Sequence, residues 1–442
     1  MAMQIAVFGT GYLGATHAAC MAELGHDVIG VDVDAGKVEK LASGDVPFYE
    51  PGLDEVLRRN IKSGRLRFST SYEEAAGCAD VHFLGVGTPQ KKGEFAADVS
   101  YVNRVIEDLA PLIDRPAVIF GKSTVPVGTA ERLGTRVREL SPAGDAVELA
   151  WNPEFLREGY AVQDTLRPDR LVLGVDPSRN GRAETVARAV YGDLLDSGIP
   201  LIVTDLATAE LVKVSANAFL ATKISFINAM AEVCEAAGAD VSVLADAIGH
   251  DARIGRKFLN AGIGFGGGCL PKDIRAFMAR AGELGADQAL TFLREVDAIN
   301  MRRRTSMVEV AKSACGGSLL GARVAVLGCA FKPDSDDVRD SPALNIAGQI
   351  QLQGAAVSVF DPKAMENSRR LFPTLYYAAS AKDACNGADV VLVLTEWQEF
   401  REMIPSDIES VVRQRHIVDG RNCLESDRWR DAGWSYQGVG RR

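Results

Sequence analysis

The feature that most constrains this chain is a glycine-rich turn near its N-terminus, Gly9-Thr10-Gly11-Tyr12-Leu13-Gly14. The turn follows an apolar segment at residues 4–8 that is typical of a buried strand, and it precedes an alanine-rich segment expected to be helical. Gly9 permits a tight turn, Gly11 lets the backbone approach a pyrophosphate, and Gly14 allows close packing of helix on strand. The pattern therefore predicts a strand–helix–strand unit that binds a dinucleotide.

The acid that follows the second predicted strand indicates which dinucleotide binds. Residues 27–32 form another apolar segment, and it ends in Asp32, 18 residues beyond Gly14. A carboxylate there accepts hydrogen bonds from a ribose 2′-hydroxyl, and the extra charge of Asp34 repels a 2′-phosphate. We therefore predict NAD rather than NADP, with Tyr12, Leu13 and Lys37 among the residues that contact it.

Strand and helix patterns alternate along most of the chain, which favours α/β architecture. Apolar segments at residues 79–86 and 117–121 extend the first sheet, which we expect to be parallel and doubly wound. Segments at residues 322–328, 355–361 and 388–394 repeat the pattern near the C-terminus. Because Cys329, Ala330 and Phe331 follow Gly328, the second Rossmann-like domain lacks the glycine motif and is expected to hold a different ligand.

A helical region separates the two Rossmann-like domains. Asp205 can cap a helix over 206–237 that ends at Gly238, about 48 Å at 1.5 Å per residue. So long a helix bridges domains or forms a subunit interface; two shorter helices are the alternative. We predict an NAD-binding domain at 1–200, a central helical domain at 201–315, and a C-terminal domain at 316–442.

Composition excludes several classes of function. The net charge of −10 argues against non-specific nucleic-acid binding, and no apolar stretch is long enough to predict a membrane span. The eight cysteines form no Cys-x-x-Cys pair and the five histidines do not cluster, so no metal site is expected. With no recognisable signal peptide, a cytoplasmic protein with reduced thiols is the simplest interpretation.

A second glycine-rich segment contains a candidate nucleophile. Five of the seven residues from 262 to 268 are glycine, and Cys269 follows them. Pro271 suits the first turn of a helix, so Cys269 is expected just before a helix N-terminus. The helix dipole and Lys272 favour its thiolate, and Asp273 can handle a proton. The alternative is a buried cysteine in a turn.

Two further pairs are weaker candidates on sequence alone. Lys213 and Asn217 lie four residues apart and share a helix face, where they can polarise a hydroxyl or carbonyl; an exposed lysine is the alternative. Glu154 and Glu158 have the same spacing and can lie on one helical turn beside a reacting centre, or on a solvated turn.

Taken together, these blocks resemble the UDP-glucose 6-dehydrogenase family of nucleotide-sugar dehydrogenases over nearly the whole chain. The matching blocks are Gly9–Gly14, Tyr49–Leu53, Gly87–Pro89, Ser123–Val127, Asn152–Leu156, Lys213 with Asn217, the Cys269 loop, Ala330–Asp334, Arg339–Pro342 and Asp419–Arg421. The resemblance implies that a sugar alcohol at C6, in UDP-glucose, is oxidised to a carboxylate with two NAD reduced.

The resemblance also implies roles for individual residues. The catalytic set would be Cys269, Lys213, Asn217, Asp273, Thr124 and Glu154. NAD would contact the glycine turn, Asp32, Lys37, Thr88, Pro89, Ser123, Thr124, Glu158, Lys272 and Arg339. The substrate would contact Glu154, Phe155, Leu156, Lys213, Asn217, Phe258, Asn260, Gly262, Gly266, Phe331, Lys332 and Arg421, with Arg253 reaching into a neighbouring subunit of a homodimer formed through the long helix.

The sequence departs from the family pattern at one position, and three alternative functions remain. Gly268 stands where many relatives have a serine or a larger residue, which predicts a more flexible loop. GDP-mannose 6-dehydrogenase has the same chemistry, but the segment from Arg253 to Asn260 looks more like the UDP-glucose branch. A single-hydride hydroxyacid-type dehydrogenase, or a non-catalytic NAD-binding regulator, would leave Cys269 without a role.

Overall fold

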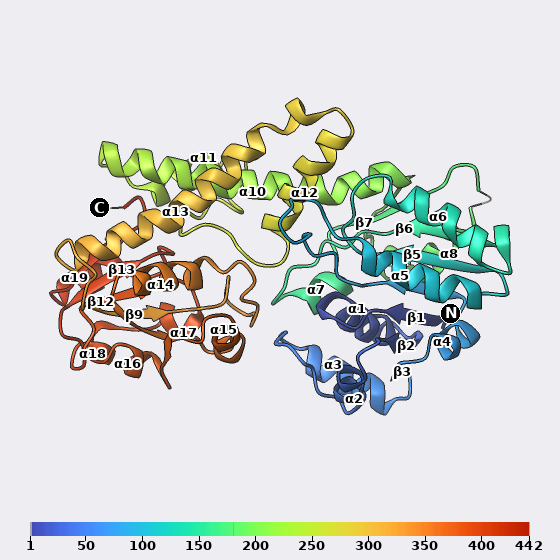
Figure 1. The fold of residues 1–442 in the computed structure, drawn as a ribbon, viewed down its shortest axis with the longest axis horizontal. Helices are drawn as coiled ribbons and strands as arrows, with labels where there is room; N and C mark the ends of the chain where they lie inside the picture. Colours follow the sequence, from blue (N-terminus) through green and yellow to red (C-terminus); the bar gives the residue numbers. More distant parts are fainter. Residues whose placement is uncertain (1, 180, 442) are drawn as a thin grey trace. The chain divides into compact units, whose positions relative to one another are not determined.

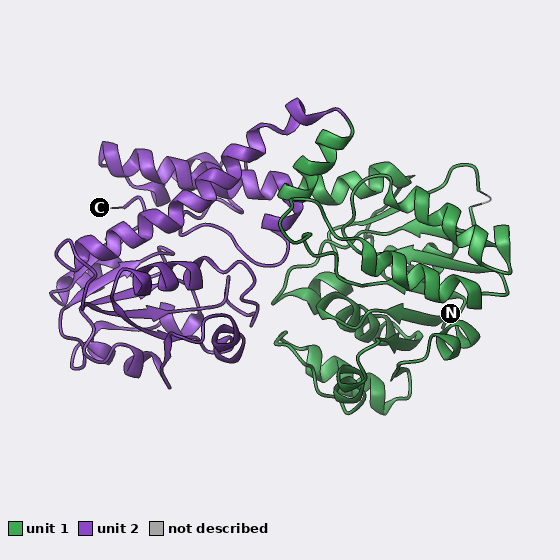
Figure 2. Ribbon diagram, in the orientation of Figure 1, with its two compact units in different colours: residues 1–216, 275–284 green, residues 217–274, 285–442 purple. Residues whose placement is uncertain are grey.

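The computed structural model describes residues 2–179 and 181–441. The chain divides into two compact units, residues 1–216 with 275–284 and residues 217–274 with 285–442 (Figure 2). Each unit has a β-sheet with helices on its faces (Figure 1). The predicted central domain at 201–315 is shared between the two units, so the three-domain division stays a prediction.

The first unit is built on an eight-stranded sheet with the order β3-β2-β1-β4-β5-β6-β7-β8. The strands are β1 (Gln4–Phe8), β2 (Asp27–Val31), β3 (Leu66–Ser69), β4 (Val81–Leu84), β5 (Ala117–Gly121), β6 (Val147–Trp151), β7 (Leu171–Val175) and β8 (Leu201–Asp205). The first six have the order expected of a dinucleotide-binding fold. The expectation of a parallel sheet is confirmed for the strands predicted from the sequence, whereas β7, for which no prediction was made, runs antiparallel to β6. A strand that is apolar on both faces has no sequence signal for its direction.

Helices cover both faces of this sheet. They are α1 (Tyr12–Glu23), α2 (Ala35–Ala42), α3 (Leu53–Lys62), α4 (Tyr72–Cys78), α5 (Ser100–Leu109), α6 (Thr129–Leu140), α7 (Ala161–Leu166), α8 (Arg182–Val190) and α9 (Gly192–Asp196), with 3₁₀ turns η1 (Ala110–Leu112) and η2 (Gly144–Ala146). Strand β1 shows why: Ile5 and Val7 enter one core cluster, whereas Ala6 and Phe8 enter another. Burying each large side chain contributes about 1.5–3 kcal/mol, so the sheet needs cover on both faces.

The second unit has a six-stranded parallel sheet with the order β11-β10-β9-β12-β13-β14. Its strands are β9 (Arg323–Leu327), β10 (Ala356–Phe360), β11 (Tyr376–Tyr377), β12 (Val390–Val393), β13 (His416–Asp419) and β14 (Ser435–Gly438). Its helices are α14 (Pro342–Leu352), α15 (Met365–Leu371), α16 (Ala381–Ala384), α17 (Gln398–Arg401), α18 (Pro405–Ile408) and α19 (Ser426–Asp431). The prediction of a second Rossmann-like domain is confirmed.

Long helices lie between the two sheets in the sequence. They are α10 (Leu206–Ala237), α11 (Val241–Gly249), α12 (Leu270–Glu283) and α13 (Phe292–Ala314), with a 3₁₀ turn η3 (Asp287–Leu290). The predicted long helix is confirmed as one helix of 32 residues, which excludes two shorter ones. Asp205 caps it by accepting hydrogen bonds from the Thr208 amide at 2.8 Å and hydroxyl at 2.7 Å. None of the helices described is both long and apolar enough to cross a bilayer.

Candidate active site

The glycine turn has the geometry that a dinucleotide needs. Gly9 has φ +85°, and a Cβ on Gly14 would lie 1.7 Å from the Gly9 carbonyl oxygen. A Cβ on Gly11 would meet no atom within 4 Å. The first and third glycines are therefore required by the fold itself, whereas the second borders open space at the N-terminus of α1. The turn thus fits a pyrophosphate, which a helix N-terminus attracts.

Asp32 is held in place at the end of β2. Its carboxylate accepts hydrogen bonds from the Thr10 amide at 2.8 Å, the Lys37 ammonium at 2.9 Å and the Asp34 amide at 3.1 Å. Burial raises the pKa of Asp32, but these donors outweigh burial and hold the pKa below its ordinary value. The Asp34 carboxylate caps α2 by accepting a hydrogen bond from the Lys37 amide at 3.1 Å. The acid predicted to bind the ribose is therefore ionised and oriented.

The segment after β6 is a loop, so the hypothesis that Glu154 and Glu158 share a helical turn was wrong. Residues 152–157 are not helical, because side chains take the amides that a helix would need. Glu154 accepts from the Leu156 amide at 2.6 Å. Glu50, which sequence reasoning did not single out, accepts from the amides of Gly159 at 2.6 Å and Ala161 at 2.7 Å. Buried Glu158 lies within this fixed turn.

The Tyr12 side chain links the glycine turn to that loop. Its hydroxyl oxygen accepts a hydrogen bond from the Gly159 amide at 2.8 Å. The carboxyl ends of β4 and β5 are also tied together, since Thr88 donates to the Thr124 carbonyl at 2.7 Å and Ser123 donates to the Val86 carbonyl at 2.6 Å. Parallel sheets bind their ligands at this edge.

Lys213 and Glu154 form a buried ion pair in the first unit. Nζ lies 3.3 Å from Oε1, and the two side chains are 7% and 14% exposed. An exposed lysine, the alternative left open by the sequence, is excluded. The ammonium also lies 5.5 Å from the ring of Phe155, and the Arg170 guanidinium lies 4.0 Å from the same ring. Two of the predicted catalytic residues and one predicted substrate contact are thus neighbours; Leu156 is half-buried beside them in the chain.

Cys269 comes directly before α12, as predicted, and it is exposed. The Asp273 carboxylate in the first turn of α12 is buried, and it accepts from the Asn217 amide at 2.6 Å and the Lys272 ammonium at 2.5 Å. Cys269 and three of the residues predicted around its thiol therefore lie together in the second unit. Lys272 is paired with Asp273, so its charge is partly compensated.

The other cysteines contrast with Cys269. Burial raises the pKa of the Cys20 and Cys385 thiols to about 12, and it raises the pKa of Cys329 and Cys423 too. Of the eight cysteines, Cys269 is the exposed one. Since a thiolate is the reactive form, these buried thiols are poor nucleophiles, and Cys269 is the candidate because it is the exposed cysteine.

Three polar side chains that the sequence analysis missed hold the glycine loop before Cys269. Asn228 on α10 accepts from the Gly262 amide at 2.8 Å. Asn300 on α13 accepts from the Phe265 amide at 2.7 Å and donates to the Phe265 carbonyl at 3.0 Å, and Arg304 donates to the same carbonyl at 3.2 Å. These residues could have been found in the sequence as polar residues that interrupt otherwise apolar helix faces.

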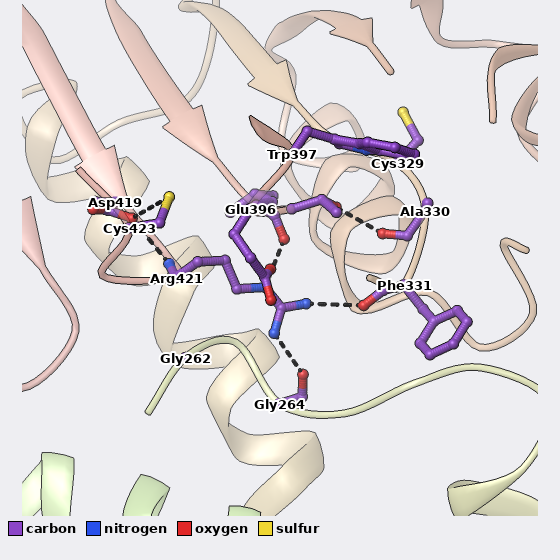
Figure 3. Close-up of polar contacts among 12 residues, drawn as sticks. Gly262, Gly264, Cys329, Ala330, Phe331, Glu396, Trp397, Asp419, Arg421 and Cys423 are labelled. Carbon is purple, nitrogen blue, oxygen red and sulfur yellow. Dashed lines mark hydrogen bonds and ion pairs between the residues drawn. The ribbon is translucent and has the colours of Figure 1, made fainter. Parts of the chain in front are cut away.

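Arg421, after β13, ties the same loop to the C-terminal sheet. Its guanidinium donates to the carbonyls of Gly264 at 3.2 Å and Phe331 at 3.2 Å, and it lies 3.3 Å from the Glu396 carboxylate (Figure 3). A Cβ on Gly262 would lie 3.4 Å from Arg421 Cδ. The structure therefore gathers Arg421, Gly262 and Phe331, three of the predicted substrate contacts, in one place.

Arg339 explains the glycine at position 268. A Cβ on Gly268 would lie 2.2 Å from the guanidinium carbon of Arg339, and the side chain is held there by Asp337 at 2.7 Å. A serine at this position would require Arg339 to move. The expected flexibility of the loop is thus offset by an arginine packed against its backbone. Gly266 is constrained too, since a Cβ there would lie 2.3 Å from the Asp340 carbonyl oxygen.

Several of the residues predicted to bind NAD or the substrate are exposed or half-buried. Arg253 has an 88% exposed side chain that pairs with Asp251 at 2.7 Å. Asn260 is exposed, and Phe258 has φ +66°. Lys332 is half-buried, with its ammonium 5.5 Å from the ring of Phe331. Pro89 is also exposed. Their ligand-binding roles stay predictions.

The acid after β10 in the second sheet has different hydrogen-bond partners from those of Asp32 in the first. Asp361, at the end of β10, accepts from the amides of Cys329 at 2.7 Å and Ala330 at 2.9 Å and from the Trp397 indole at 3.1 Å. The carboxylate thus takes the amides that follow β9, where a dinucleotide phosphate would bind in the first sheet. This agrees with the expectation of a different ligand there.

Comparison with known proteins identifies the family. Three models of the UDP-glucose/GDP-mannose dehydrogenase family match the chain: the NAD binding domain over residues 3–195, the central domain over 207–302 and the UDP binding domain over 325–426. A UDP-glucose 6-dehydrogenase of Rhizobium meliloti (strain 1021) is 42% identical, with 99% of this chain and 100% of the relative covered. The UDP-glucose 6-dehydrogenase YwqF of Bacillus subtilis (strain 168) is 38% identical, with 100% and 98% covered.

A solved structure agrees with these sequence matches. The UDP-glucose dehydrogenase of the hyperthermophilic archaeon Pyrobaculum islandicum superimposes with a TM-score of 0.91 at 36% identity, covering 100% of this chain and 98% of that one. The likeness extends over both sheets and the helices between them. The chain therefore belongs to the UDP-glucose/GDP-mannose dehydrogenase family, and it is an NAD-dependent oxidoreductase.

Proposed function

We propose that this chain oxidises UDP-glucose to UDP-glucuronate, with two NAD reduced per molecule of substrate. The observation that supports this most directly is the exposed Cys269, next to Asp273 with its Asn217 and Lys272 partners, in a chain so similar over its full length to UDP-glucose 6-dehydrogenases. A single-hydride dehydrogenase has no use for an exposed thiol there.

The first oxidation removes a proton and a hydride from the C6 alcohol, and NAD supplies the hydride acceptor. Lys213 and Asn217 stabilise the negative charge that develops on the sugar oxygen. Glu154, already paired with Lys213 at 3.3 Å, assists in the proton transfer. Glu158, Lys272 and Arg339 are among the residues that we propose contact NAD from outside the glycine turn.

The second oxidation needs Cys269. An aldehyde gives up a hydride readily only after a nucleophile has added to its carbonyl. The Cys269 thiolate adds to form a thiohemiacetal, hydride loss then gives a thioester, and water releases the carboxylate with return of the thiol. Asp273 and Thr124 hold or activate that water. Arg421, Lys332 and Phe331 hold the uridine diphosphate.

The test is the yield of NADH with a panel of nucleotide sugars. We expect two NADH per UDP-glucose consumed, and slower reaction with GDP-mannose or UDP-N-acetylmannosamine. One NADH per substrate would refute the double oxidation. Cys269→Ser should block net turnover while UDP-glucose still binds, and Cys423→Ser, at a half-buried thiol, is the matched control. Full turnover by the Cys269 variant would exclude it as the nucleophile.

We also propose a homodimer formed through α10. Phe219, Phe226 and Val233 are 66%, 47% and 56% exposed, and they recur every seven residues along that helix. Apolar residues at this spacing share one face, and an exposed apolar stripe is typical of an interface. Phe226→Glu should give a monomer in sedimentation, whereas Leu352→Glu, at an exposed residue of α14, should not. A Phe226 variant that remains dimeric would contradict this assignment.

A cytoplasmic location completes the proposal. No disulfide joins any of the cysteines within the described residues, as expected where thiols stay reduced. Cell fractionation followed by immunoblotting tests it, and recovery of the protein outside the cytoplasm would contradict it.

A further inference from the structure

The direction of strand β7 brings an arginine to the candidate site. Because β7 runs antiparallel to β6, with Trp151 opposite Gly174, it begins at the sheet edge where β6 ends. The Asn152 side chain donates to the Val172 carbonyl at 2.7 Å, which holds the loop after β6 along the start of β7. Arg170 directly precedes this strand of five residues, and in a parallel strand it would lie about 16 Å away, at the opposite edge.

The Arg170 side chain covers the ring of Phe155. The antiparallel register, continued for four residues from Trp151 and Gly174, places Phe155 opposite Arg170. The guanidinium carbon lies 4.0 Å from the ring centre, and both side chains are half-buried. A planar guanidinium stacks on an aromatic ring and is attracted to its electron-rich face. The rest of the ring packs against the apolar core, so the ring is held from two sides.

The contact with Phe155 is the polar interaction that the structure gives Arg170. Within residues 2–179 and 181–441, its guanidinium forms no ion pair and no hydrogen bond. The neighbouring carboxylate of Glu154 is paired with Lys213 instead. The position of the guanidinium is therefore linked to the ring and not to a carboxylate.

The same ring lies beside the buried ammonium of Lys213. Nζ lies 5.5 Å from the Phe155 ring centre and 3.3 Å from the Glu154 carboxylate. Two consecutive residues of one loop thus hold this ammonium, one by its charge and the other by its ring. A ring that lost its contact with Arg170 would be free to move away from Lys213.

We propose that Arg170 is a positioning residue for the oxidation: its guanidinium holds the Phe155 ring against the Lys213 ammonium. This proposal rests on the proposed function, in which Lys213 stabilises the negative charge on the sugar oxygen. Because Arg170 acts through Phe155 on a group that works in the transition state, its loss should lower kcat more than it changes KM. An arginine that bound the anionic part of the substrate directly would instead change KM, and the change would depend on salt.

Kinetics of an Arg170 variant test this role. Arg170→Met removes the cation and keeps a long side chain, and we expect kcat with UDP-glucose to fall about three- to tenfold, as the loss of one cation–π contact implies, with KM changed by less than about twofold. Arg170→Lys keeps the charge without the plane and should recover part of kcat. Arg167→Met, at an exposed arginine earlier in the same loop, is the matched control and should change neither value.

The loss should also depend on Phe155. In a Phe155→Leu background, Arg170→Met should cause no further fall in kcat, because the ring through which Arg170 acts is absent. An equal fall in both backgrounds would overturn the proposal. A rise in KM with an unchanged kcat would overturn it too, since that result is expected of a direct contact with the substrate.

The position of the ring can be followed without substrate or cofactor. In protein labelled with fluorophenylalanine, the ¹⁹F resonance that is lost in Phe155→Leu reports this ring. It should shift in Arg170→Met and stay in place in Arg167→Met; an unshifted resonance in Arg170→Met would contradict the proposal. If Arg170→Met does not fold, Arg170→Gln also lacks the charge and should give the same results. Failure of the wild type to oxidise UDP-glucose would refute the proposed function alone, because the resonance measurement does not depend on that substrate.

Discussion

His82 makes the stability of the first sheet depend on pH. The side chain points from the central strand β4 into the core, is 1% exposed, and neither ring nitrogen has a hydrogen-bond partner among the described residues. Burial lowers its pKa from 6.5 to about 4. The unfolded chain therefore binds a proton more readily than the folded one, and the sheet loses stability as pH falls below about 6.5. The full difference of about 2.5 units corresponds to ~3.4 kcal/mol.

About 2 kcal/mol of that difference should appear between pH 7.5 and pH 5. His82→Leu removes it, and should be at least as stable as the wild type at neutral pH because two unpaired polar atoms leave the core. Hydrogen exchange of the β4 amides at the two pH values, corrected for intrinsic rates, measures the opening free energy of this sheet. His250→Gln, at an exposed histidine, is the control. If protection falls equally in the wild type and His82→Leu, the reasoning is refuted.

Three further predictions concern the site. Asp32→Ala should reduce the preference for NAD over NADP in kcat/KM by at least about tenfold, because the ribose acceptor and a repelling charge are both lost; an unchanged ratio would count against Asp32. Asn300→Ala leaves the Phe265 amide unpaired and its carbonyl with Arg304 as the remaining donor. This change should lower kcat by more than about tenfold while NAD affinity in a binding titration changes little; a normal kcat would show that the loop does not need this support. Glu50→Gln loses one of the two amide contacts that hold the turn containing Glu158, and it should raise KM for NAD several-fold in initial-rate measurements. An unchanged KM would show that this turn does not affect cofactor binding.

Much of the fold followed from the sequence because its signals are local. The glycine turn, the apolar strands and the Asp205 cap each act within a few residues, and all three were found where predicted. The direction of β7 was not predictable, since an apolar strand packs equally well either way round. The loop at 152–157 was misread for a related reason: the Glu154 and Asp164 side chains accept from the amides of Leu156 and Arg157. Glu50, about a hundred residues earlier in the chain, then accepts from the amides of Gly159 and Ala161 in the turn that follows.

The residues proposed for catalysis were easier to predict from the sequence than the residues that hold the site in position. Cys269, Asp273 and Lys213 stood out because a reactive or charged residue in a glycine-rich or apolar setting is unusual. Asn300 did not, because one polar residue in a long helix has no distinctive spacing. Its importance comes from its contacts with Phe265, which is 35 positions away in the chain. Such contacts exist only once the chain has folded.

The two Rossmann-like sheets show how one acid can admit or exclude a dinucleotide. Asp32 and Asp361 occupy equivalent places at the ends of β2 and β10. Asp32 accepts from the Thr10 amide and leaves the space beside Gly11 open, whereas Asp361 accepts from two consecutive amides, the second belonging to Ala330. Once an alanine replaces the middle glycine, its Cβ occupies the approach to the backbone and its amide is already used. A phosphate would then displace a buried carboxylate from its donors, which is unfavourable, so the same fold is left to a ligand that binds elsewhere on its edge.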